Sequence, residues 1–270
     1  MKNKLNGKVA VITGASRGIG YSIAKRFAEQ GMIVYDISRT AVEHEEIKKS
    51  FSCDVNDFDK MEQILQEIVE IEKKIDIFVN NAGFGIAGAV EYSKKENIYK
   101  QVDTNLSAVI ALSGLAVKYL KQSKGKLINI SSVGGIMPLP YQATYSATKA
   151  GVEVFSRALA NEVAGYGVKV SSILPGDTKT GFTSARVVEN DIKDEKQRQN
   201  IEKTLKKIAN DEQKGMSPDS VAKVAVKIAK KKNPPLRVTV GTSYKFLVFL
   251  QRIISTRFLN FIIRKLYCNK

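Results

Sequence analysis

The sequence predicts a single α/β domain in which helices cover both faces of a parallel, doubly wound sheet. Short runs rich in Val and Ile alternate along the chain with amphipathic helical patterns, and such runs are typical of strands buried on both faces. A length of 270 residues and a hydrophobic content of 43% suit one large domain. Because no repeat or low-complexity linker divides the sequence, we expect one domain over residues 1–245 and a basic, apolar extension over residues 246–270.

The first half of the chain alternates four strand-like runs with helical segments. The helix after the first run is expected to stop at Gly31, since glycine tolerates the conformation that ends a helix. A later helix carries apolar residues at helical spacing from Met61 to Ile71. The expected strands are residues 8–13, 32–37, 50–53 and 75–79, and the expected helices are residues 19–30 and 57–73.

The second half continues the alternation and then changes character. Residues 176–215 are strongly charged, contain a helical stretch at 191–211, and have the pattern of a mobile flap over a substrate. Ser217, Pro218 and Asp219 are typical of a helix start, with a capping serine and a proline in the first turn. Further helices are expected within residues 94–121 and at 145–165, and further strands at 126–130, 168–174 and 237–240.

Composition excludes several function classes. The single histidine, His44, lies in a charged run and is expected at the surface, which excludes histidine triads and multi-histidine metal sites. Cys53 and Cys268 form neither a disulfide framework nor a metal-ligand pattern, so we expect no metal. No signal peptide and no run of about 18 uncharged apolar residues is found, and a cytoplasmic protein is expected.

The net charge of +16 is concentrated at the carboxyl end. Residues 201–270 hold 16 Lys and Arg against 4 Asp and Glu, whereas the first 200 residues hold 27 against 23. Such potential can attract nucleic acid, anionic lipid or an acidic protein, and solvated helix faces are the alternative explanation. No nucleic-acid motif accompanies the charge, so we expect no nucleic-acid partner.

A glycine-rich turn joins the first expected strand to the first expected helix. Its glycines allow a tight turn and a close approach by a pyrophosphate, whose charge is stabilised by backbone N–H groups at the helix N-terminus. A purely structural turn is the alternative. The expected cofactor contacts in this turn are Gly14, Ser16, Arg17, Gly18, Ile19 and Gly20.

The spacing of these glycines, T-G-x-x-x-G-x-G, resembles that of the short-chain dehydrogenase/reductase family, and further family motifs follow in order over residues 8–178. The resemblance implies a Rossmann fold and an oxidoreductase. It implies further cofactor contacts at Asp54 and Val55 beside the adenine, at Asn81, Ala82 and Gly83 in an N-N-A-G turn beside the ribose, and at Pro175, Gly176 and Thr178 over the nicotinamide. Asn105, Ser132, Tyr145 and Lys149 match the family's catalytic tetrad.

The Y-x-x-x-K spacing places Tyr145 and Lys149 on one helix face. A phenol with a pKa of about 10 is a poor base at neutral pH, and a nearby cation is expected to lower that pKa. The resemblance implies that Tyr145 protonates a carbonyl oxygen bound also by Ser132, while NADPH delivers hydride. It further implies that Lys149 holds the nicotinamide ribose and that Asn105 anchors a water. Each residue alone has an ordinary structural alternative, and the combination favours catalysis.

The end of the second expected strand indicates the cofactor. NAD enzymes place an acidic residue there to bind the ribose 2′-hydroxyl, and NADP enzymes place arginine near the phosphate. The corresponding position is Ser38, followed by Arg39, and Arg17 offers a second cation. Asp36 comes two residues earlier and is expected to point elsewhere. These residues favour NADP.

The evidence for the substrate comes from one loop and leaves alternatives open. Residues 132–140 resemble the estradiol and retinol dehydrogenase branch of the family, which implies a lipophilic ketone or secondary alcohol. A 3-oxoacyl-(acyl-carrier-protein) reductase is the alternative, less favoured because 27 residues follow the final turn at Ser243. A non-catalytic NADP sensor or scaffold is a third reading, since fold does not dictate function. Turnover of NADPH against a panel of ketones distinguishes an enzyme from a sensor.

The extension is dense in Phe, Leu and Ile from Phe246 to Tyr267, and Ser255 and Thr256 are expected to divide it into two short helices. A basic, apolar segment suits peripheral contact with a membrane surface. Packing over the substrate cleft or into the interface of a homodimer or homotetramer is the alternative, and we favour packing on the protein. The basic residues of the segment are Arg252, Arg257, Arg264 and Lys265.

Overall fold

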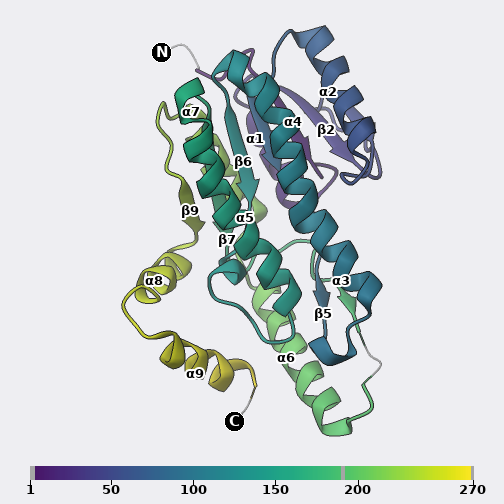
Figure 1. Ribbon diagram of the computed structural model, residues 1–270, viewed down its shortest axis with the longest axis vertical. Coiled ribbons are helices and arrows are strands. Elements are labelled where there is room, and N and C mark those ends of the chain that lie inside the picture. The colour runs from purple at the N-terminus through teal and green to yellow at the C-terminus, as the bar shows by residue number, and fades with distance from the viewer. Residues whose placement is uncertain (1–3, 190–191, 269–270) are drawn as a thin grey trace.

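The computed structural model describes residues 4–189 and 192–268, and it shows a seven-stranded parallel sheet between two layers of helices (Figure 1). The strand order is β3-β2-β1-β4-β6-β7-β9. The chain therefore runs outward from β1 to one edge, returns to β4 beside β1, and then builds towards the other edge. This is the doubly wound architecture that the sequence predicts, with its topological switch between β1 and β4.

The observed elements lie within a few residues of the expected ones. The strands of the main sheet are β1 (Val9–Thr13), β2 (Ile33–Ser38), β3 (Lys49–Ser52), β4 (Ile77–Asn80), β6 (Lys126–Ile130), β7 (Lys169–Pro175) and β9 (Arg237–Val240). The helices are α1 (Gly18–Ala28), α2 (Phe58–Glu72), α3 (Lys95–Val102), α4 (Ala108–Ser123), α5 (Ala143–Glu162), α6 (Glu195–Gln213), α7 (Pro218–Lys230), α8 (Thr242–Leu250) and α9 (Thr256–Tyr267).

Two helical regions differ from the sequence-based expectation. The region expected within residues 94–121 is divided by a π-helical turn, η2 (Asp103–Ser107), between α3 and α4. Asp191, where the flap helix was expected to begin, lies outside the described residues. The observed helix α6 starts at Glu195, because the Asp194 side chain accepts hydrogen bonds from the first-turn N–H groups of Lys196 and Gln197.

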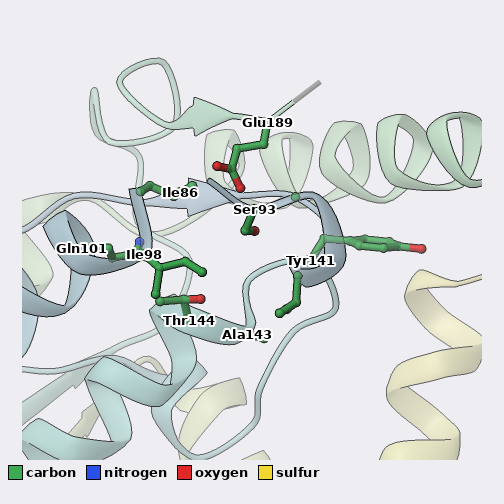
Figure 2. A pocket seen from close by; sticks show the side chains of 10 residues that line it. Ile86, Ser93, Ile98, Gln101, Tyr141, Ala143, Thr144 and Glu189 are labelled. Atoms are coloured by element: carbon green, nitrogen blue, oxygen red, sulfur yellow. The ribbon is translucent and has the colours of Figure 1, made fainter. Parts of the chain in front are cut away.

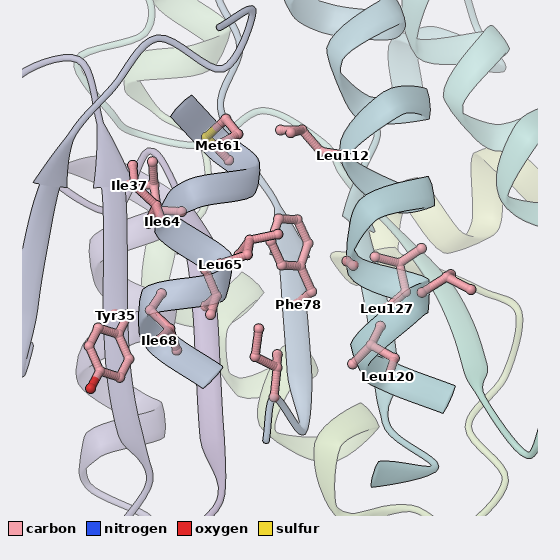
Figure 3. Close-up of a cluster of buried hydrophobic side chains, with 14 of the residues drawn as sticks. Tyr35, Ile37, Met61, Ile64, Leu65, Ile68, Phe78, Leu112, Leu120 and Leu127 are labelled. Carbon is pink, nitrogen blue, oxygen red and sulfur yellow. The ribbon is translucent and has the colours of Figure 1, made fainter. Parts of the chain in front are cut away.

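Alternate residues of each central strand enter separate hydrophobic cores. In β1, Val9 and Val11 pack with residues of α2, α4 and α5, and Figure 3 shows part of this cluster. Ala10 and Ile12 point to the opposite face and pack with residues of α1 and α7. Burial on both faces is the physical reason that the strands read as continuous apolar runs rather than alternating ones.

The flap is tied to the loop after β4 by a second, two-stranded sheet. Strand β5 (Ile86–Ala87) pairs in parallel with β8 (Val187–Val188). The N–H of Val187 donates to the carbonyl of Gly85 at 3.0 Å, next to the N-N-A-G turn. The charged segment is therefore anchored beside the expected active site.

The carboxyl-terminal extension forms two helices, as expected, and Ser255 separates them by capping α9 through a bond from the N–H of Phe258. Val248 of α8 is buried against Val133 and Leu174, so the extension packs on the protein. The two helices lie at the opposite end of the molecule from α2 (Figure 1). Within the described ranges, no helix combines the length and apolar character needed to span a bilayer.

Candidate active site

The glycine-rich turn between β1 and α1 has the backbone that a dinucleotide needs. Gly14 and Gly18 adopt left-handed conformations, with φ angles of 71° and 63°. A Cβ atom on Gly20 would lie 2.2 Å from the carbonyl oxygen of Gly14, so no other residue fits there without a shift of the backbone. Arg17 precedes α1 in an extended conformation, and its side chain does not cap the first turn. The N–H groups at this helix start are thus suited to bind a pyrophosphate.

The N-N-A-G turn is held against the glycine turn by Asn81. Its side-chain amide donates to the carbonyl oxygens of Thr13 (2.9 Å) and Gly14 (3.0 Å). In return, the Thr13 hydroxyl accepts from the N–H groups of Asn81 and Ala82. These bonds join the carboxyl ends of β1 and β4 at the topological switch, where ligands of doubly wound folds bind.

Asp54 and Val55, which are expected to contact the adenine, follow β3 at the same edge of the sheet. Val55 is buried in the core cluster. The Asp54 carboxylate accepts from the backbone N–H and the side-chain amide of Asn56, both at 2.9 Å. Asp54 therefore has a structural role in this turn in addition to its expected contact.

The residues at the end of β2 lie only in part as expected for a cofactor-binding site. Asp36 is buried and points inward, as expected, accepting from the N–H of Ala15 and the hydroxyl of Ser38, both at 2.7 Å. Burial raises the pKa of Asp36, while these hydrogen bonds lower it. Ser38 is itself buried, so its hydroxyl faces the protein rather than a 2′-phosphate. Arg17 and Arg39 are exposed, and neither forms an ion pair with any described residue.

His44 is not the solvated surface residue that the sequence suggests. Its ring stacks on Tyr21 with centroids 4.2 Å apart, and its Nε2 atom lies 3.2 Å from the carbonyl oxygen of Ser16. The loop after β2 folds back over the glycine turn and half-buries the ring. A lone histidine in a charged run carries no local signal of such a long-range contact.

Asn105 lies in the π-helical turn η2 and is fully buried. Its amide donates to the carbonyl of Phe84 at 2.8 Å, and its Oδ1 accepts from the N–H of the same residue at 3.0 Å. A Cβ atom on Gly83 would lie 3.1 Å from Asn105 Oδ1 and 3.7 Å from Lys149 Nζ. Asn105 therefore fixes the chain directly after the N-N-A-G turn, and its role as a water anchor stays a prediction.

Helix α5 brings Tyr145 and Lys149 together, with Lys149 Nζ 5.8 Å from the centre of the Tyr145 ring. Lys149 is buried and donates to the carbonyl of Ile130 at 2.9 Å. Ser132 follows β6, and its hydroxyl accepts from the N–H of Gly134 at 3.0 Å. The helix and the strand end thus place three members of the expected tetrad at one point.

The pKa of Tyr145 is shifted in the direction opposite to the one expected from Lys149. Burial raises the pKa of the Tyr145 phenol to about 12, and a hydrogen bond with Ser132 lowers it by less. Burial also lowers the pKa of Lys149 to about 8. Desolvation penalises the charged form of both groups and is the largest influence on each pKa. Tyr145 is consequently held as a neutral phenol, which is the form that donates a proton.

The flap supplies residues that the sequence did not single out. The ring of Phe182 lies 5.7 Å from that of Tyr145, tilted by 59°. The guanidinium of Arg186 lies 5.8 Å from the Phe182 ring and pairs with Glu212 of α6 in a largely buried ion pair. Thr183 donates to the other carboxylate oxygen of Glu212. These contacts cover Tyr145 with an apolar ring, and no sequence motif marks them.

Helix α8 supports the turn expected over the nicotinamide. The ring of Tyr244 packs so closely on Gly176 that a Cβ atom there would lie 2.2 Å from it. The Tyr244 hydroxyl donates to Asp177 at 2.5 Å, and Thr178 donates to the carbonyl of Gly176 at 2.8 Å. Pro175 ends β7 directly before this turn. The first turn of α8, which leads into the extension, therefore supports the turn that is expected to lie over the nicotinamide.

A small pocket lies at the start of α5, and no member of the tetrad lines it (Figure 2). It is bounded by α3, the start of α5 and the flap residue Glu189, and it has room for about one water molecule. Glu189 mainly holds the start of α3, accepting from the N–H of Lys94 at 2.8 Å and from Asn97 at 3.0 Å. We assign this pocket a structural role.

Comparison with known proteins identifies the family. A family model described as short chain dehydrogenase matches residues 8–209. The chain belongs to the short-chain dehydrogenase/reductase family. As a member, it is an oxidoreductase that uses a nicotinamide dinucleotide, and its glycine turn fits that cofactor.

Short-chain dehydrogenase/reductase relatives differ in how much of this chain they match. A 3-ketodihydrosphingosine reductase of Bacteroides thetaiotaomicron is 38% identical over 236 residues, covering 87% of this chain and 88% of that protein. A 3-oxoacyl-[acyl-carrier-protein] reductase of Vibrio cholerae is 36% identical over 189 residues, covering 67% of this chain and 78% of that protein.

Solved structures of the family share the fold. A short-chain dehydrogenase from Streptomyces avermitilis has a TM-score of 0.80 at 24% identity, covering 91% of this chain and 92% of that one. A 3-ketoacyl-(acyl-carrier-protein) reductase from Brucella melitensis, complexed with NADH, has a TM-score of 0.73 at 25% identity, covering 88% of this chain and 98% of that one.

Proposed function

We propose that this protein uses NADPH to reduce the ketone of a long-chain lipid, with 3-ketodihydrosphingosine as the first candidate substrate. The observation that carries the proposal is the extent of the relationship. The match to a 3-ketodihydrosphingosine reductase spans 87% of the chain, whereas the match to a carrier-protein reductase spans 67%. A lipophilic ketone also agrees with the apolar ring of Phe182 beside Tyr145.

In the proposed reaction, bound NADPH supplies the hydride that forms the new C–H bond at the carbonyl carbon. Tyr145 donates its proton to the carbonyl oxygen, so that the ketone becomes a secondary alcohol. Ser132, which hydrogen-bonds the Tyr145 phenol, lies where it can donate to the same oxygen. Lys149 holds the nicotinamide ribose, and Asn105 keeps the N-N-A-G turn in register.

The preference for NADPH rests on Arg39 and Arg17, because both are exposed and unpaired in the described chain. Asp36 uses its carboxylate inside the fold and does not offer it to a ribose 2′-hydroxyl. Arg39→Ala should therefore raise the Kd for NADPH about tenfold and leave the Kd for NADH nearly unchanged. Fluorescence titration with both cofactors measures the two constants. An equal increase in the Kd for NADPH and for NADH would show that Arg39 does not contact the 2′-phosphate.

The second candidate is the reduction of a 3-oxoacyl thioester on an acyl-carrier protein. The carrier-protein reductase of Vibrio cholerae is nearly as similar over the region that it matches. The basic carboxyl end of this chain would suit an acidic carrier protein. Against this candidate, the chain continues through α8 and α9, beyond the end at which we expect such enzymes to stop.

A direct assay separates the candidates. We would compare NADPH oxidation with 3-ketodihydrosphingosine in mixed micelles and with an acetoacetyl thioester of a carrier protein, and detect dihydrosphingosine by mass spectrometry. The proposal expects a higher kcat/KM for the lipid ketone, and Tyr145→Phe serves as the inactive control. A higher kcat/KM for the thioester overturns the choice of substrate. Tight NADPH binding without turnover of any carbonyl compound would favour the sensor reading.

A further inference from the structure

We propose that α8 and α9 form a surface that binds the face of an anionic lipid bilayer. This tail surface consists of exposed aromatic and aliphatic side chains among cations. It comprises Phe246, Phe249, Ile253, Phe258, Phe261, Arg252, Arg257, Arg264 and Lys265. Such binding would hold the protein at a membrane whichever carbonyl compound it reduces.

In α8, the packed side and the apolar exposed side are different. Val248 is buried in the cluster with Val133 and Leu174, and Tyr244 one turn earlier contacts Asp177. Phe246 and Phe249 project to the other side of the helix and are more than half exposed. The side of α8 that carries Val248 is enough to pack the helix on the protein. Packing therefore does not explain why the opposite side is also apolar.

Helix α9 repeats this arrangement. Leu259 and Ile263, one turn apart, are buried. Phe258 and Phe261 lie on the opposite side, 52% and 45% exposed, and their rings stack on each other with centroids 6.4 Å apart. Lys265 extends over the Phe261 ring, 5.7 Å from its centre. A helix with a packed face and a second, aromatic and cationic face is typical of peripheral membrane segments.

The tail surface carries more exposed apolar side chains than a surface that faces only water. Two consecutive helices and the turn between them, with apolar side chains 45–67% exposed, present more apolar surface than the isolated residues scattered over an ordinary protein surface. Such surface marks a site of interaction with a protein, a ligand or a membrane.

The charge around the tail surface favours lipid. Residues 242–268, which form α8, α9 and the turn between them, contain five Lys and Arg and no Asp or Glu. In a two-fold symmetric dimer the same patch meets itself, so a second copy would bring one cationic surface against another. Anionic headgroups supply the missing negative charge, and the acyl region just beneath them accepts the phenyl rings.

The test uses the full-length protein and vesicle co-sedimentation. We would measure partition onto phosphatidylcholine vesicles with and without phosphatidylglycerol. The proposal expects binding to the anionic vesicles, weakened by salt, and little binding to the neutral ones. Absence of binding to anionic vesicles overturns it, and equal binding to both overturns the anionic assignment.

Point variants locate the binding surface. Phe258→Ser with Phe261→Ser, and separately Arg257→Gln with Arg264→Gln, should each reduce the partition coefficient about tenfold. The matched controls change exposed residues of α3: Tyr99→Ser for the rings, and Lys95→Gln with Lys100→Gln for the charges. All variants should keep the melting temperature and turnover of a small ketone, because the altered side chains are exposed.

Two further outcomes decide against lipid. If light scattering shows a dimer that the Phe258→Ser, Phe261→Ser variant loses, a second copy covers the surface and the proposal is wrong. If binding persists in both tail variants and falls in the α3 controls, the membrane contacts another part of the protein, which also overturns it.

Discussion

Burial determines how the two ionisable side chains at the start of α5 can act. The phenol of Tyr145, with its pKa raised to about 12, stays protonated over the whole physiological range. Lys149, with its pKa lowered to about 8, loses its proton first as the pH rises. The site is therefore poised for proton donation by Tyr145, which agrees with work in the direction of carbonyl reduction.

Replacing Tyr145 with Phe should lower kcat for ketone reduction by about 10²–10⁴-fold, because only the proton donor is lost. NADPH affinity and the melting temperature should remain near those of the wild type, since the ring still fills its position against Phe182. Steady-state kinetics with a cofactor titration measures both. A variant that retained more than about a tenth of the rate would exclude Tyr145 as the general acid.

The pH profile of kcat/KM tests the state of Lys149. Lys149 carries a charged ammonium group below its pKa and a neutral amine above it. Any step that requires the ammonium is therefore lost as the pH rises through this pKa. We expect kcat/KM for reduction to be level below about pH 8 and to fall about tenfold per pH unit above it, while Tyr145 remains protonated. A break near pH 10 would show that burial does not shift Lys149.

At the scale of elements, the site depends on a strand end, a helix start and a flap meeting at one edge of the sheet. Asn81 joins the ends of β1 and β4, and the pairing of β5 with β8 draws the flap towards them. The ion pair of Arg186 with Glu212 then connects the flap to α6, so that Phe182 lies over Tyr145. Substitutions in any of these elements should weaken the binding of cofactor or substrate more than they destabilise the rest of the fold.

The start of α1 offers a sharp test with an internal control. Gly20→Ala would place a methyl group 2.2 Å from the Gly14 carbonyl oxygen and 2.5 Å from the Asn81 amide. We expect it to reduce the free energy of unfolding by roughly 1–3 kcal/mol and to abolish NADPH binding. Gly114→Ala, at an exposed position of α4 where an added Cβ atom meets nothing within 4 Å, should instead stabilise the protein by up to about 1 kcal/mol. Denaturant unfolding compares them, and two similar results would contradict the close approach at Gly20.

At the scale of the whole molecule, the extension belongs to the catalytic domain as a structural part. It buries Val248, Leu259 and Ile263, and Tyr244 just before it supports the turn at Gly176. The expectation of a dimer or tetramer stays a prediction, which light scattering would test.

Deletion of residues 246–270 should lower the melting temperature by about 3 °C or more. Burial of each of the three apolar side chains contributes roughly 1.5–3 kcal/mol, and the entropy of ordering the segment offsets part of it. Differential scanning calorimetry measures the shift, and KM for a small ketone reports on the adjoining turn. Unchanged stability and kinetics would mean that the helices do not pack as described.

Features that depend on residues close together in the chain could be predicted from the sequence. Apolar periodicity predicted the alternation of strands and helices, and the four-residue spacing of Tyr145 and Lys149 placed both on one helix face. The break at Ser255 predicted two tail helices. These predictions succeed because helix and strand geometry depends on local spacing and capping.

Features that depend on burial and on long-range contacts became visible only in the folded protein. The same Tyr145 that a cation should acidify has a raised pKa, because the surrounding fold shields much of it from water. His44 stacks on Tyr21, and Phe182 covers the tyrosine, although neither residue has a local signal. In the tail, the sequence could not say which side of α9 is packed and which carries Phe258 into solvent. Desolvation and packing arise from segments far apart in the chain, so no local pattern of residues encodes them.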